Sequence, residues 1–172
     1  MKIFQIKYSQ ILPISLQDAW KFFSNPRNLD KITPPWLNFR ITSEVASKMY
    51  PGQIITYKVS PLLNIPVTWV TEITHVNEPY YFVDEQRFGP YKMWHHEHIF
   101  TEIPNVGVEM QDIVTYALPF GIIGNIANAL FVKKRVKEIF EYRKQILSSL
   151  MSPSVNEKGE LEFFKLENIK FK

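Results

Sequence analysis

The apolar and polar positions of this chain follow a period of about two first, then one of about 3.6, then two again. Residues 3–11 alternate between apolar and polar side chains until a proline ends the run, which is typical of a first strand. Residues 16–23 carry apolar side chains at helical intervals and stop at Asn25-Pro26. A second short helical turn fits residues 28–32 before further prolines break the chain. One strand and two short helices are therefore predicted at the start.

Six further runs rich in β-branched and aromatic residues follow, separated by turn signals that contain Pro, Gly or Asn. They predict strands at residues 37–45, 53–60, 66–75, 80–87, 91–102 and 108–118. The connections are too short for the crossovers that parallel strands need. Consecutive strands should therefore pair in sequence order as an antiparallel meander.

A single amphipathic helix is predicted over residues 122–150, after the breaking sequence Pro119-Phe120-Gly121. We expect its apolar stripe to pack on the sheet. The stripe consists of Ile122, Ile126, Leu130, Val136, Ile139, Phe140, Ile146, Leu147 and Leu150. The order of elements predicts an α+β fold in which a curved antiparallel seven-stranded sheet (β-α-α-β6-α) wraps around a long C-terminal helix, with a cavity between them.

Residues 1–150 resemble the START-like helix-grip superfamily, which includes polyketide cyclase and dehydrase-like proteins and lipid-transfer proteins. The resemblance rests on Phe82, Asp84, Gln86, Gly89-Pro90-Tyr91, Trp94, His96, His98 and Phe100, then Asp112, Tyr116, Leu118-Pro119, Gly121, Gly124 and Ile139-Phe140-x-Tyr142-Arg143. It implies a helix-grip fold with a ligand cavity in residues 1–150, but a shared scaffold does not imply a reaction. Residues 151–172 lie outside the resemblance, and we expect a tail or an added edge segment there.

The composition fits one soluble domain. The 172 residues include no cysteine, which excludes disulfides, thiol catalysis and cysteine-ligated metals. No secretory h-region and no apolar run long enough to span a membrane is found, so we expect a cytoplasmic protein. No pattern typical of nucleic-acid binding is present.

The net charge is +3, and the predicted C-terminal helix alone carries six basic and two acidic residues. Those basic residues are Lys133, Lys134, Arg135, Lys137, Arg143 and Lys144. Such a helix either presents a solvated outer face or attracts an anionic membrane or an acidic partner.

Candidate chemistry gathers on two neighbouring strands. His96 and His98 share one face with Trp94, because side chains alternate along a strand. Asp112 lies on the more apolar face of the next strand, together with Tyr116. Asp112 could orient a histidine as a general base and raise its pKa, with Tyr116 as the hydrogen-bond donor. The same network could equally specify packing, or orient a ligand without turnover.

Aromatic residues interleaved with a few polar ones suit a ligand pocket. The candidate ligand-binding residues are Trp69, Phe82, Asp84, Gln86, Trp94, His96, His98, Phe100, Asp112 and Tyr116. A metal ion bound by His96, His98 and Asp112 is conceivable, yet their spacing matches no known zinc motif, so we expect neither a metal nor another cofactor. Phosphate-binding loops and the Gly-x-Ser-x-Gly motif are also missing.

The sequence thus favours binding or transport of a small apolar ligand, such as a lipid, an isoprenoid quinone or a polyketide-like aromatic molecule. One alternative is a cyclase- or dehydrase-type enzyme that uses His96 or His98, Asp112 and Tyr116. Another is a membrane-peripheral or protein-interaction module that uses the basic helix and the apolar loop at residues 61–66.

Overall fold

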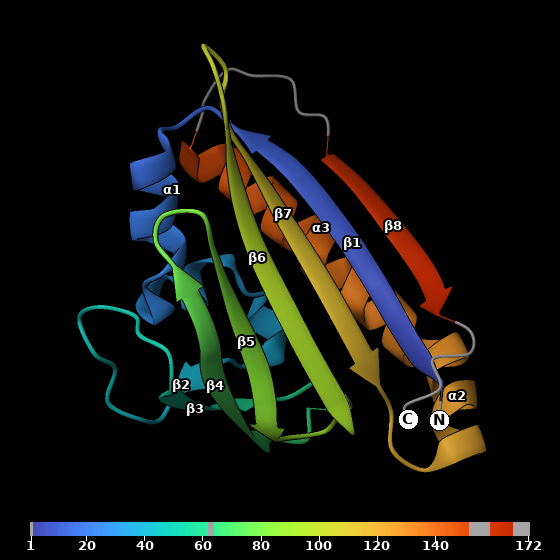
Figure 1. The fold of residues 1–172 in the computed structure, drawn as a ribbon. Helices are drawn as coiled ribbons and strands as arrows, with labels where there is room; N and C mark the ends of the chain where they lie inside the picture. Colours follow the sequence, from blue (N-terminus) through green and yellow to red (C-terminus); the bar gives the residue numbers. More distant parts are fainter. Residues whose placement is uncertain (1, 62–63, 152–158, 167–172) are drawn as a thin grey trace, which may run out of the picture.

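The computed structural model describes residues 2–61, 64–151 and 159–166, and its largest feature is one antiparallel sheet (Figure 1). The strands are β1 (Ile3–Leu12), β2 (Arg40–Ile41), β3 (Gln53–Val59), β4 (Val67–Asn77), β5 (Tyr81–Phe88), β6 (Met93–Ile103), β7 (Gly107–Ala117) and β8 (Gly159–Leu166). Their order in the sheet is β2-β3-β4-β5-β6-β7-β1-β8. Strands β2 to β7 therefore pair in sequence order, which confirms the predicted meander.

The segment between β1 and β2 contains one short α-helix and three 3-10 turns. Helix α1 (Leu16–Phe23) begins at Ser15, whose hydroxyl accepts a hydrogen bond from the Asp18 backbone N–H at 3.1 Å. Three 3-10 turns follow: η1 (Pro26–Asn28), η2 (Asp30–Ile32) and η3 (Pro35–Leu37). The strand predicted at residues 37–45 is wrong in its extent, since β2 spans two residues. The last turn ends at Asn38, whose backbone lies in the left-handed region with φ 47°. The strand therefore begins only at Arg40, later than predicted.

The C-terminal helical segment has three parts: α2 (Gly121–Ala127), the π-helical stretch η4 (Asn128–Val132) and α3 (Lys133–Met151). Helix α3 lies against one face of the sheet, behind β7 and β1 in the view of Figure 1. Its buried apolar side chains are Val136, Phe140 and Leu147. The predicted α+β helix-grip arrangement, a curved antiparallel sheet that holds a long C-terminal helix, is therefore confirmed.

The predicted apolar stripe of this helix is wrong at its ends. Ile122, Ile126, Leu130 and Leu150 are exposed rather than packed on the sheet. Within η4 the hydrogen bonds span one more residue than in an α-helix. The 3.6-residue period read through residues 122–150 therefore does not hold across this stretch, and the apolar side chains of α2 project into solvent.

Two further segments complete the description. Strand β8 pairs with β1 in antiparallel register, from Gln10 opposite Gly159 to Ile3 opposite Leu166, and so adds an edge to the sheet. Residues 152–158 and 167–172 of the predicted tail, and residues 62–63 of the predicted apolar loop, lie outside the described residues. None of the helices in the described part of the chain combines the length and apolar character that crossing a bilayer requires.

Candidate functional site

A cavity of about 180 Å³ lies between the sheet, the 3-10 turns and α3. This volume is many times the roughly 10–15 Å³ that one water molecule needs. The aromatic part of its wall consists of Phe22, Phe23, Phe39, Tyr57, Trp69, Phe82, Tyr91, Trp94 and Phe140. Aliphatic side chains from β3, β4, α3 and the 3-10 turns supply most of the rest, including Ile55, Ile73 and Val136. The cavity is therefore predominantly apolar.

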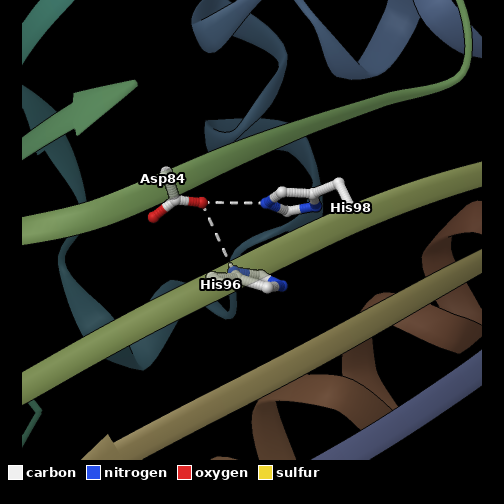
Figure 2. A group of neighbouring side chains, drawn as sticks. All are labelled: Asp84, His96 and His98. Carbon is white, nitrogen blue, oxygen red and sulfur yellow. Dashed lines mark hydrogen bonds and ion pairs between the residues drawn. The ribbon is translucent and has the colours of Figure 1, made fainter. Parts of the chain in front are cut away.

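One wall of the cavity is ionisable, because three adjacent strands place their polar side chains at the same level. Asp84 of β5 lies opposite His96 of β6, and His98 of β6 lies opposite Asp112 of β7. Asp84, His96 and His98 line the cavity, and Figure 2 shows Asp84 facing both imidazole rings. Asp112 lies on the far side of the two rings and is fully buried. We call Asp84, His96, His98 and Asp112 the His–Asp cluster.

The His–Asp cluster brackets each imidazole between two carboxylates. His96 Nε2–H donates to Asp112 Oδ1 at 2.9 Å, and His98 Nδ1 lies 2.8 Å from the same oxygen. On the other side, His98 Nε2–H donates to Asp84 Oδ2 at 2.9 Å, and His96 Nδ1 lies 3.5 Å from that oxygen. Every ring nitrogen of the two histidines therefore faces a carboxylate.

This arrangement shifts the pKa values of the two carboxyl groups and the two imidazoles of the His–Asp cluster. Burial alone would raise the pKa of Asp112, but the hydrogen bonds from His96 and His98 outweigh it and hold that pKa well below its usual range. The pKa of Asp84 is lowered for the same reason, chiefly by its hydrogen bond from His98. Burial and the neighbouring charge of His98 lower the pKa of His96. Burial also acts to lower the pKa of His98, yet hydrogen bonds to its two carboxylate partners raise it overall, so the pKa values of the two histidines shift in opposite directions.

Arg143 completes the polar wall from α3. Its Nη1 lies 3.6 Å from Asp112 Oδ2, and its guanidinium lies 5.2 Å from the centre of the Phe140 ring. The expectation that Arg143 belongs to a solvated or partner-facing basic surface is wrong, because Arg143 is buried. The burial of Arg143 could have been predicted from its position in the helix. Buried residues recur every three or four positions along α3: Val136, Phe140, Arg143 and Leu147.

Six of the predicted ligand-binding residues line the cavity: Trp69, Phe82, Asp84, Trp94, His96 and His98. Two others do not. Gln86 closes the turn between β5 and β6, since its Nε2 donates to the Tyr91 carbonyl at 2.6 Å and its Oε1 accepts from the Tyr91 N–H at 3.2 Å. Phe100 packs in the core against Trp20 and Phe23.

Tyr116 lies apart from the His–Asp cluster. Its hydroxyl donates to Asn128 Oδ1 in η4 at 2.8 Å, and its partner across the sheet is Trp94. Tyr116 and Asp112 are four residues apart on one strand, which separates their Cα atoms by roughly 13 Å. The predicted constellation, with Tyr116 as the donor beside a His–Asp pair, is therefore wrong.

Comparison with known proteins shows the fold. No protein-family model matches the chain, and no curated protein matches it in sequence. A protein of Chromobacterium violaceum, CV1439, superposes with a TM-score of 0.65 at 12% identity, over 87% of this chain and 99% of that one. Protein Ms6760 of Mycobacterium smegmatis gives a TM-score of 0.59 at 16% identity, over 85% and 92%.

The structure of Ara h 8.0201 gives a TM-score of 0.53 at 14% identity, over 86% of this chain and 99% of that one. Each of the three matches covers at least 85% of this chain and at least 92% of the other, so the chain is similar to these proteins in architecture. At these identities the likeness shows the helix-grip fold and no particular function.

Proposed function

We propose that the protein binds a small apolar molecule in the cavity between the sheet and α3. The observation that carries this proposal is the cavity itself, which is about 180 Å³ in volume, mainly apolar and not filled by the protein's own side chains. Removing ligand surface from water stabilises the complex by about 25 cal/mol per Å² of apolar area. An aromatic wall suits flat or chain-like molecules, and the proposed classes are lipids, isoprenoid quinones and polyketide-like aromatic compounds. The START-like resemblance supports the same proposal.

The polar wall would orient such a ligand. Asp84, His96, His98 and Arg143 lie together, whereas the lining contributed by β3 and the 3-10 turns is largely apolar. Pockets of this kind obtain affinity from their apolar walls and orientation from a few polar groups. The expected ligand is therefore amphiphilic, with an oxygen-bearing end toward His98 and Arg143 and an apolar body toward Ile55 and Met49.

Native mass spectrometry of the purified full chain tests this proposal. We expect a fraction of the protein to carry an added mass that denaturation releases as an apolar species. The Ile55→Trp variant, which narrows the cavity, should carry less of it, since Ile55 lines the wall. A chain that shows only its own mass in every preparation, and takes up neither fatty acid nor quinone when these are added, would contradict ligand binding.

We also propose a second function, attachment to anionic membranes, because α2, η4 and the residue before α2 expose several large apolar side chains. This surface, the α2 ridge, consists of Phe120, Ile122, Ile123, Ile126, Leu130 and Phe131, each between 55% and 81% exposed. Exposed apolar patches on this scale mark interaction sites. Lys133, Lys134, Arg135 and Lys137 follow directly in the sequence. Apolar side chains bordered by basic ones favour the interface of an anionic bilayer, where each Lys or Arg contributes about 1 kcal/mol.

Replacing Ile123 and Phe131 together by aspartate should abolish this attachment. In sedimentation with phosphatidylserine-containing vesicles, we expect the wild type to pellet at low salt and to pellet less at high salt, because ions screen the attraction of the basic residues. The double variant should stay in solution. Phe88→Asp is the matched control, since Phe88 is equally exposed but lies on β5. Equal sedimentation of the double variant and the wild type, or no sedimentation of either, would refute the proposal.

A further inference from the structure

The His–Asp cluster has two sides with different chemistry. Asp112 Oδ1 lies within hydrogen-bonding distance of one nitrogen of each ring, His96 Nε2 and His98 Nδ1. A neutral imidazole has a single N–H, and here both rings can give it to Asp112. In this tautomer His98 no longer donates Nε2–H to Asp84, and His96 Nδ1 and His98 Nε2 turn lone pairs toward Asp84 Oδ2. Three electron-pair donors thus converge on one point of the cavity wall (Figure 2).

We propose that Asp84 Oδ2, His96 Nδ1 and His98 Nε2 bind a divalent transition-metal ion. Of the described residues, these three offer ligand atoms that all lie within 4.8 Å of one another. The carboxylate oxygen lies 2.9 Å from His98 Nε2 and 3.5 Å from His96 Nδ1. Ligands at about 2.0–2.1 Å from a tetrahedral zinc ion are roughly 3.3 Å apart, so only shifts of a few tenths of an ångström are needed between Asp84 and the two rings. The metal is thus expected to replace the hydrogen bond between Asp84 and His98.

Asp112 supplies the support that such a site requires. Metal-binding histidines almost always donate their second N–H to a carboxylate or carbonyl, which fixes the tautomer and the ring orientation. Here one carboxylate oxygen serves both rings. The other oxygen, Oδ2, has no hydrogen-bond partner among the described residues and faces Arg143 at 3.6 Å. Asp112 is therefore a positioning residue for both histidines rather than a metal ligand.

The charge balance also favours a cation. The Asp112 carboxylate is fully buried and that of Asp84 is partly buried, and the two are accompanied by the buried guanidinium of Arg143. Buried charges are stable only when they are compensated. Two carboxylates and one guanidinium leave a net charge of −1. A divalent ion more than offsets this charge and a proton on His98 offsets it in full, which makes the proton the competing occupant.

The ligand set points to a class of metal. Two imidazoles and one carboxylate suit Zn²⁺, Fe²⁺ or Co²⁺, whereas Ca²⁺ and Mg²⁺ prefer oxygen alone. All three residues line the cavity, so the remaining coordination positions face the space proposed for the ligand. This inference goes beyond the proposed function, because the ion would bind whether or not an apolar molecule is present.

Titration of Zn²⁺ and Co²⁺ into the tag-free full chain, after treatment with a chelator, tests the site. Calorimetry should give one ion per chain, and Co²⁺ should develop the visible absorption bands of a low-symmetry nitrogen and oxygen site. We expect Asp84→Asn and His98→Gln to remove the binding, and Asp112→Asn to weaken it by about 10–100-fold through the misplaced rings. His75→Gln is the matched control, since His75 is exposed near the end of β4.

A second readout does not depend on the variants folding. Zn²⁺ should raise the thermal midpoint of the wild type, and a chelator should reverse the shift, because an ion that binds only the folded state stabilises it. The proposal is overturned if the wild type binds neither Zn²⁺ nor Co²⁺ stoichiometrically, which leaves the proton as the occupant. It is also overturned if folded Asp84→Asn binds as tightly as the wild type, or if His75→Gln removes the binding.

Discussion

The Asp112→Ala variant is expected to lose about 3–5 kcal/mol of its free energy of unfolding, the cost of removing one member of a buried charged network. Asp112 is fully buried and is the shared partner of His96, His98 and Arg143. Alanine would leave His96 Nε2 and His98 Nδ1 without their acceptor, and the buried Arg143 without the carboxylate that it faces. Urea denaturation at neutral pH, followed by circular dichroism, measures this loss.

Glu85→Ala is the matched control for Asp112→Ala. Glu85 lies on β5 next to Asp84 but faces the other side of the sheet, where it lies 2.9 Å from His95 and 3.0 Å from Arg87. Pairs that are this accessible to water contribute about 0–1 kcal/mol. If both variants lose the same small amount, the buried carboxylate does not stabilise the fold as argued.

The effect of Asp112→Ala should also depend on pH. Because the pKa values of Asp84 and Asp112 are lowered in the folded protein, their contribution to stability is complete above the unfolded value of about 3.9. It is lost as the pH falls toward the lower folded values. The difference in unfolding free energy between wild type and Asp112→Ala should therefore shrink progressively below about pH 4.

The Ile55→Trp variant is expected to bind an apolar fluorescent dye, anilinonaphthalene sulfonate, at least about ten-fold more weakly than the wild type. Such a change corresponds to about 1.4 kcal/mol in binding free energy. Ile55 is 5% exposed and lines the cavity, so an indole at this position occupies space that the dye needs. Fluorescence titration measures the change.

Ile54→Trp is the control, because Ile54 is the next residue of β3, points to the other face and is 47% exposed. It introduces the same side chain without touching the cavity and should leave dye affinity unchanged. Overpacking at Ile55 costs about 1–3 kcal/mol, so the unfolding midpoint of each variant must show that it is folded at the assay temperature. Equal dye affinity in the two variants would mean that the dye binds elsewhere.

The sheet and one wall of the site could be predicted from the sequence, because both follow from local rules. Alternating apolar residues and turn signals located β3 to β7 to within a few residues. Strand parity alone placed His96 and His98 on one face and His95 on the other, and apolar character placed Asp112 inward. These inferences needed no knowledge of how the helix packs.

The remaining features depend on tertiary contacts, which the spacing of apolar residues along the sequence does not reveal. Tyr116 shares a face of β7 with Asp112 but lies too far along the strand to contact it. The Tyr116 hydroxyl therefore donates its hydrogen bond to Asn128 instead. The π-helical stretch η4 interrupts the helix, so the apolar residues of α2 do not continue the buried stripe of α3. Arg143 could be recognised as buried only by giving its position on that stripe more weight than its charge.

The central claim, a ligand-binding space between the sheet and α3, is tested most directly by methyl NMR spectra of the wild type titrated with anilinonaphthalene sulfonate. We predict shifts and intermolecular nuclear Overhauser effects at the methyl groups of Ile55, Ile73 and Val136, which line the cavity. The methyl groups of Ile11 and Ile54, which face solvent, should stay unchanged. Contacts confined to the surface methyl groups, with those of the cavity unmoved at saturation, would contradict the account.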